Sequence, residues 1–133
     1  MGHLINWDND EKTVLLQMYT DPVTKDDLYH LVKNTAAMLA ACDHTVHLII
    51  DERKVNFVLN SADLGYIQKM LPPNQGTVML VVLPGNLAYK QLFLDRVTYQ
   101  VDRDGTHFVE SNRDARLLLQ QLYHVHYASE LAS

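Results

Sequence analysis

The sequence predicts one α/β domain, in which helices cover a single mixed and mostly parallel sheet. Two β-rich runs open the chain, His3–Trp7 and Thr13–Tyr19, and the polar segment between them suits a hairpin. Two nearly continuous apolar runs follow, Val46–Ile50 and Val78–Leu83, and such runs are typical of parallel strands that are buried on both faces. Helical spacing of apolar residues around these runs completes the alternation of strands and helices that defines this class.

The first helix is predicted from Thr24 to about Ala41. The Thr24 hydroxyl can accept a backbone N–H at the helix start, and the acidic Asp26 and Asp27 complement the positive end of the helix dipole. The positions that follow are spaced three and four residues apart and form one buried stripe, which consists of Leu28, Leu31, Val32, Thr35, Met38 and Leu39.

A shorter helix is predicted between the two buried runs. Strand, helix and strand in this order form a right-handed crossover unit. Its apolar face carries Leu64, Ile67 and Leu71, and it ends before Pro72 and Pro73, which lack the backbone N–H that a helix interior requires. We therefore expect this helix to pack on the sheet with one face exposed.

The remainder of the chain is predicted to supply two more helices and one strand. A helical stretch runs from about Leu87 to Val97, and Thr106–Val109 forms a short strand. The last helix begins after Ser111, whose hydroxyl can cap it, with Asp114 at the capping-box position. Its buried stripe consists of Ala115, Leu118, Leu119 and Leu122. The predicted order over residues 1–133, taken as a single domain, is β-β-α-β-α-β-α-β-α.

Composition and charge argue against several classes of function. The 133 residues are 47% apolar and 20% charged, which is typical of a globular domain and not of a disordered chain. The formal net charge of −5 disfavours nucleic-acid binding. Cys42 is the only cysteine, Met1 to Asp10 does not resemble a signal peptide, and no apolar run is long enough to cross a bilayer. We therefore expect a cytoplasmic protein without a nucleic-acid or membrane partner.

The segment 46–67 carries the strongest functional signal. It reads VHLIIDERKVNFVLNSADLGYI, in which an apolar strand ends in Asp51. The apolar residues Val55 and Phe57 follow the strand, and a helix then begins after a polar pair. This arrangement resembles the STAS domains of the sulfate transporter and anti-sigma factor antagonist family. In these domains a strand closes with Asp, an apolar-aromatic pair follows, and Asp-Ser-Ser/Thr-Gly-Leu stands at a helix N-terminus. With one residue inserted, that signature falls on Asn60, Ser61, Ala62, Asp63 and Leu64.

The resemblance implies a STAS-like fold and a non-enzymatic regulatory role, with a partner-switching kinase or a related anti-sigma regulator as the class of protein partner. In the antagonist proteins the second hydroxyl residue of the signature is usually phosphorylated, and that position is Ala62 here. Ser61 keeps a hydroxyl; the neighbouring Asp63 would repel an added phosphate, whereas the helix dipole would favour it. Asn60 and Ser61 also fit a purely structural role as helix caps. The resemblance thus supports partner binding more than a phosphorylation switch.

Candidate contact residues lie on and next to this short helix. Tyr66 and Lys69 are expected on its outer face, beside the positions that bind partners in STAS domains. The whole predicted site, with Ser61 as the candidate phosphosite, comprises Asp51, Asn60, Ser61, Asp63, Leu64, Tyr66 and Lys69. A buried Ser61, or a chain without a helix after it, would contradict this prediction.

Other residues that could carry chemistry favour simpler interpretations. Cys42, His44 and His47 are close in sequence, but we expect them at a helix end, in a turn and in a strand, so that their side chains diverge instead of forming a zinc site. His124 and His126 are expected in the last turn of the final helix, where cationic side chains complement the dipole. The sequence contains no G-x-S-x-G motif and no glycine-rich phosphate loop. We predict no enzymatic activity, no metal and no cofactor.

Two alternatives to a regulatory protein-binding module stay open. The first is a small-ligand or lipid-binding domain, in which an apolar wall is formed by Leu87, Leu92, Phe93 and Leu94. The turn at 84–86 would lie at the carboxyl end of a sheet strand, where α/β proteins tend to bind ligands. The second is a self-associating domain whose homodimer is structural.

Overall fold

A five-stranded mixed sheet forms the centre of the structure, a computed structural model that describes residues 2–55, 60–70, 72–83 and 106–127. The strands are β1 (His3–Trp7), β2 (Val14–Tyr19), β3 (Val46–Asp51), β4 (Gln75–Val81) and β5 (Thr106–Val109). The helices within these residues are α1 (Lys25–Ala40), α2 (Ser61–Met70) and α4 (Asn112–Tyr123).

The strands follow one another across the sheet in chain order, β1-β2-β3-β4-β5. β1 and β2 form an antiparallel pair, and all later neighbours are parallel. The predicted hairpin and the mixed, mostly parallel sheet are therefore confirmed. The predicted helix at 87–97 lies outside the described residues, so the predicted order β-β-α-β-α-β-α-β-α is tested only for the other elements.

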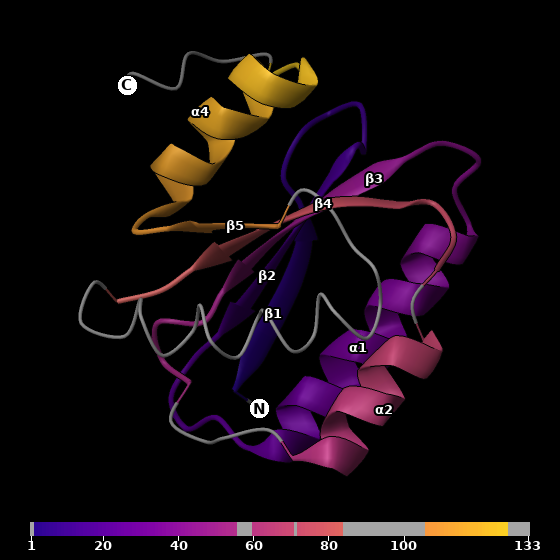
Figure 1. The fold of residues 1–133 in the computed structure, drawn as a ribbon, viewed down its shortest axis with the longest axis vertical. Coiled ribbons are helices and arrows are strands. Elements are labelled where there is room, and N and C mark those ends of the chain that lie inside the picture. Colours follow the sequence, from indigo (N-terminus) through magenta and orange to yellow (C-terminus); the bar gives the residue numbers. More distant parts are fainter. Residues whose placement is uncertain (1, 56–59, 71, 84–105, 128–133) are drawn as a thin grey trace.

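The helices form one layer on each face of the sheet. Figure 1 shows α1 and α2 side by side over one face and α4 over the opposite face. The connections β2-α1-β3 and β3-α2-β4 step across the sheet in the same direction, and crossovers of one hand place their helices on the same face. α4 follows the last strand and packs back over β3, β4 and β5.

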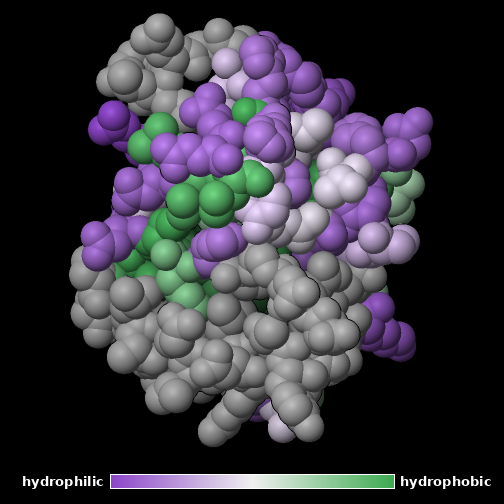
Figure 2. Space-filling view, turned by 45° about the horizontal axis from the view of Figure 1, so that its top comes forward, coloured by the Kyte–Doolittle hydropathy of each residue, from purple (hydrophilic) through white to green (hydrophobic). Residues whose placement is uncertain are grey.

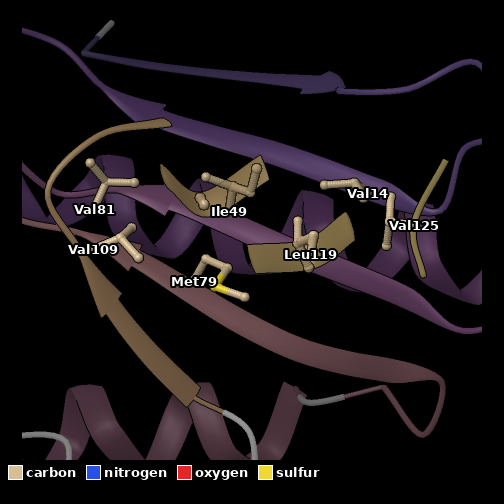
Figure 3. Close-up of a cluster of buried hydrophobic side chains, with 8 residues drawn as sticks. Val14, Ile49, Met79, Val81, Val109, Leu119 and Val125 are labelled. Carbon is tan, nitrogen blue, oxygen red and sulfur yellow. The ribbon is translucent and has the colours of Figure 1, made fainter. Parts of the chain in front are cut away.

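The core beneath α4 is made of aliphatic side chains from four strands and the helix. In Figure 3, Ile49, Met79 and Leu119 point toward one another between the sheet and α4, and all three are fully buried. The other members of this cluster are Val14, Val81, Val109, Ala115 and Val125. On the opposite face, α1 buries the stripe predicted for it through Leu28, Leu31, Thr35 and Leu39.

Helix starts were predictable because their signals are local. Thr24 caps α1, and the Asp27 carboxylate accepts the Thr24 N–H at 2.8 Å, which is the return half of a capping box. Ser111 caps α4, because its Oγ accepts the N–H of Asp114 at 3.0 Å. Both predicted N-cap positions are confirmed, and the predicted side-chain cap is present at Ser111.

The predicted end of α4 is wrong. His124 adopts a left-handed conformation with φ 58° and stops the helix after Tyr123, so neither His124 nor His126 lies in its last turn. Its backbone N–H donates to the Leu119 carbonyl, which closes the helix in the way that a C-terminal glycine often does. A non-glycine residue at this position gave no stop signal in the sequence.

The bounds of β4 also differ from the prediction, since the strand begins at Gln75 and ends at Val81. Gln75 pairs with Val46, and the register then shifts so that Val78 pairs with Leu48. A Cβ at Gly76 would collide with Nδ1 of His47, so the irregular pairing requires a glycine there. The polar start of β4 lacks the apolar pattern by which the rest of the strand was predicted.

The described surface is mostly hydrophilic in the view of Figure 2, where hydrophilic side chains border the upper part of an apolar area. Among the described residues, the large apolar side chains that are exposed are Leu4, Leu83 and Leu122. Within these residues, no helix combines the length and the apolar character needed to cross a membrane.

Candidate functional site

The predicted site lies where α1 and α2 begin, at the edge of the sheet where β2 and β3 end. Carboxyl ends of parallel strands share one edge of a sheet, and loops at this edge commonly carry binding residues. Here the two helix starts touch, because Lys25 Nζ in the first turn of α1 lies 2.8 Å from Asp63 Oδ2 in the first turn of α2. The first turn of α2 is therefore fixed on α1.

Asp63 is the centre of this contact and is buried, with 3% of its surface exposed. Its Oδ1 accepts the Tyr29 hydroxyl at 2.6 Å, and its Oδ2 accepts the Asn60 N–H at 2.9 Å. Asn60 Oδ1 accepts the Asp63 N–H at 2.9 Å in return. Asn60 and Asp63 thus form a reciprocal capping box, and Lys25 and Tyr29 tie that box to α1.

These partners stabilise the charged form of the carboxylate. The Lys25 ammonium, then the Tyr29 hydroxyl and the Asn60 N–H, lower the pKa of Asp63 to about 2. The same hydrogen bond raises the pKa of the Tyr29 hydroxyl. The charge that the sequence places two residues after Ser61 is therefore turned inward and paired with Lys25.

Asp27 forms a second buried acidic centre, at the start of α1. Its Oδ1 lies 2.6 Å from Nδ1 of His3 and accepts the Gly2 N–H at 3.0 Å, while Oδ2 accepts from Thr24. The hydrogen bond to His3, followed by those to Thr24 and Gly2, lowers the pKa of Asp27 to about 2 despite its burial. This carboxylate joins the chain start to α1.

Both carboxylates should make the fold sensitive to acid. Each has a folded-state pKa of about 2 against 3.8 for the free group, so its stabilisation is complete above about pH 4 and is lost as the pH falls toward 2. We expect the free energy of unfolding, measured by urea titration, to drop across this window. Asp27→Asn and Asp63→Asn should each flatten the drop, whereas Asp26→Asn, an exposed neighbour in the same turn as Asp27, should leave it unchanged. Equal slopes in all four proteins would contradict this assignment.

One face of α2 is open to solvent, and its residues are small except for Lys69. Ser61 is the first residue of the helix and is exposed, as are Ala62, Gly65 and Lys69. Positions separated by three and four residues share one face of a helix, so these four form a single surface, which we call the α2 face. The requirement for an exposed Ser61 followed by a helix is met.

Among the described residues, no contact requires a glycine at position 65. A Cβ built at this position meets no atom within 4 Å, in contrast to Gly76. Glycine inside a helix is less favourable than alanine by about 1 kcal/mol. Gly65 therefore leaves open space on the α2 face, and nothing in the described chain fills it.

Tyr66 does not lie on the outer face where it was predicted. It is half-buried, and its ring centroid lies 4.6 Å from that of Tyr29 at an interplanar angle of 52°. Position 66 follows Asp63 by three residues, so it shares the side of α2 that faces α1. Ile67 packs on the same side, against the cluster that contains Leu28 and Leu31. The Leu64 side chain lies outside the described part of the structure.

Asp51 belongs to a separate group at the end of β3. It is buried, and its carboxylate accepts the backbone N–H of Arg53 at 3.1 Å and the Arg53 guanidinium at 3.0 and 2.6 Å. Hydrogen bonding to Asp51 raises the pKa of Arg53. Asp51 thus shapes the turn that leaves the strand, and the segment 56–59 that leads to α2 lies outside the described residues.

The cysteine and histidines close in sequence point to different partners. Cys42 Sγ lies 3.5 Å from the Met38 carbonyl, His44 Nε2 lies 2.8 Å from the Lys12 carbonyl, and His47 Nδ1 accepts the Thr77 N–H at 3.0 Å. Burial lowers the pKa of His47. In the part of the chain that the structure describes, no group of three or more His, Cys, Asp or Glu side chains is placed to hold a metal ion.

Sequence reasoning missed Lys25 and Tyr29 as parts of the site. They are four residues apart on α1, beside its buried stripe, and this spacing shows that they share a face. It does not show that the face meets α2. The apolar wall expected for a ligand pocket, at Leu87, Leu92, Phe93 and Leu94, lies outside the described residues.

Compared with known proteins, the chain matches no family model, and no curated protein or solved structure is significantly similar to it. The resemblance to STAS domains therefore rests on the residues of the signature.

Proposed function

We propose that the chain is a non-enzymatic regulatory module that binds a protein partner through the α2 face. The observation that carries this proposal is Gly65, an exposed mid-helix glycine that no contact within the described residues requires. A helix without side-chain bulk lets another backbone or a flat side chain approach closely, which is a common use of glycine at contact surfaces.

The network beneath the α2 face supports a role in recognition. Asn60, Asp63, Lys25 and Tyr29 hold the first turn of the helix on α1, so the exposed side is presented without further ordering. Binding to a preformed surface avoids the entropy of ordering it, which favours affinity. The same buried carboxylate places its charge away from the solvent side of the helix.

The resemblance to STAS domains suggests the class of partner, a partner-switching kinase or a related regulator. Ser61 is the hydroxyl that such a switch would use in this chain. Its position at the start of α2 favours an added phosphate through the helix dipole, and the pairing of Asp63 with Lys25 reduces the repulsion expected from the sequence. Intact-mass analysis of the protein from its source cells tests this modification directly.

Gly65→Arg is the variant that tests the proposed surface. The open space at this position accepts a long side chain, and the change should keep the fold or stabilise it by up to about 1 kcal/mol. We expect the affinity for a partner captured from source cells, re-measured with the purified partner, to fall at least about tenfold, a typical effect of obstructing the centre of an interface.

Ala37→Arg is the matched control, since Ala37 is an exposed small residue on α1. It adds the same side chain to another helix and should leave the affinity unchanged. Equal affinity of the Gly65→Arg variant and the original chain for every captured partner would refute the proposal. A retained apolar ligand in native mass spectrometry would favour the ligand-binding alternative instead.

A further inference from the structure

β1 is the edge strand among the strands that the structure describes, and none of these lies beside its outer side. The ladder to β2 includes the bonds from Thr20 N–H to the Gly2 carbonyl and from Asp8 N–H to the Val14 carbonyl. Hydrogen-bonded pairs alternate along an antiparallel ladder, so even-numbered residues of β1 face β2 and odd-numbered ones face outward. The outward N–H and C=O groups are those of His3, Ile5 and Trp7.

These outward groups form no backbone hydrogen bond with any other described residue. Natural edge strands usually carry a lysine, a proline, a bulge or an inward charge that prevents pairing with another chain. β1 reads HLINW and has none of these devices, and its register with β2 is regular throughout. Leu4 projects from this strand with 51% of its surface exposed. Both features favour an additional strand at this edge.

The edge is complementary to itself. If two copies of β1 meet antiparallel about Ile5, then Ile5 faces Ile5, and His3 of each copy faces Trp7 of the other. Every outward N–H and C=O of these residues then has a partner, because facing residues of this kind exchange both hydrogen bonds. The even-numbered side chains lie on the opposite face of the sheet from the odd-numbered ones. There, Leu4 of one copy lies beside Asn6 of the second copy and diagonal to Leu4 of the second copy.

Charge also favours a second copy at this place. The chain carries a net charge of −5, so most surfaces would bring like charges together on self-association. β1 contains no Asp, Glu, Lys or Arg, and the ring of His3 lies against the buried Asp27.

We propose that the protein forms a two-fold symmetric homodimer in which the β1 strands pair antiparallel about Ile5 and join the two sheets. This proposal goes beyond the proposed function, because β1 and the α2 face are separate surfaces.

Leu4→Lys tests the pairing in the full chain. The two introduced lysines, one from each copy, lie close to each other only in the dimer. Like charges at neighbouring cross-strand positions are unfavourable. Sedimentation equilibrium should give twice the 15.2 kDa chain mass for the original protein. The dissociation constant of the dimer should rise at least about tenfold in the variant. Asn6→Lys, also at an exposed position, should act in the same direction.

Leu122→Lys is the matched control, because Leu122 on α4 is 52% exposed and the substitution is identical. Its dimer should be as stable as that of the original chain. Trp7 is the only tryptophan, so its fluorescence should change on dilution together with the mass.

An original chain that stays monomeric up to its solubility limit would overturn the pairing, even if it binds a strand from another protein. A dimer that resists both β1 lysines, or that Leu122→Lys dissociates, would overturn it as well. Partner affinity of Gly65→Arg is read separately, so either proposal can fail without the other.

Discussion

Replacing Leu119 with alanine is expected to lower the free energy of unfolding by about 3 kcal/mol, the middle of the range for a buried leucine in a packed core. Leu119 is fully buried and lies opposite Ile49 and Met79 between α4 and the sheet (Figure 3). Truncation removes these contacts and leaves a cavity that strands on one side and a helix on the other cannot easily close. Urea unfolding followed by Trp7 fluorescence measures the effect.

Leu122 provides the internal comparison for this prediction. It belongs to the same helix and to the stripe predicted from the sequence, yet 52% of its surface is exposed. Leu122→Ala should therefore change the stability by less than about 0.5 kcal/mol. If the two alanine variants were equally destabilised, α4 would have to face the sheet differently from the structure described.

The contrast between Leu119 and Leu122 shows which features of α4 its apolar pattern predicts and which it does not. The spacing of Ala115, Leu118, Leu119 and Leu122 correctly indicated which side of the helix meets the sheet. It could not show that Leu122 is left exposed, because the width of the covered area depends on strands elsewhere in the chain. The periodic pattern gives the direction of burial and not its extent.

Local chemistry explains which boundaries were predictable. Thr24 and Ser111 are N-cap residues whose partners, Asp27 and Asp114, follow three positions later, so the sequence alone identifies them. His124 ends α4 in a conformation that favours glycine, and Gln75 begins β4 through pairing with Val46. Both outcomes are set by neighbours in space, and a single sequence does not show them.

The candidate site follows the same division. The helix start at Asn60 and Ser61 was predicted from residue types and is present in the structure. The partners of Asp63 were not, since Tyr29 is separated from it by 34 positions. A carboxylate that the sequence shows only as a charge beside Ser61 is an anchor between two helices. This role depends on the packing of α2 on α1, which the sequence does not show.

Arg116→Ala is expected to destabilise the fold by about 3 kcal/mol, because it removes the arginine partner of the buried Asp8 carboxylate. Nε and Nη2 of Arg116 lie 3.0 and 2.9 Å from the two oxygens of Asp8, whose side chain is 6% exposed. The Tyr127 hydroxyl also donates to Asp8 at 2.6 Å. This group joins the β1–β2 connection to α4 and to the residues after it, across more than 100 positions of sequence.

Arg113→Ala is the matched control, because Arg113 is exposed on the same helix and no ion pair involves it among the described residues. Its effect on unfolding should stay within about 0.5 kcal/mol. Arg116→Ala should in addition leave partner affinity unchanged at temperatures where it is folded, since α4 and α2 lie on opposite faces of the sheet (Figure 1). Lost affinity in a folded Arg116→Ala protein would mean that the recognition surface reaches the α4 side, and the assignment of binding to the α2 face would then be wrong.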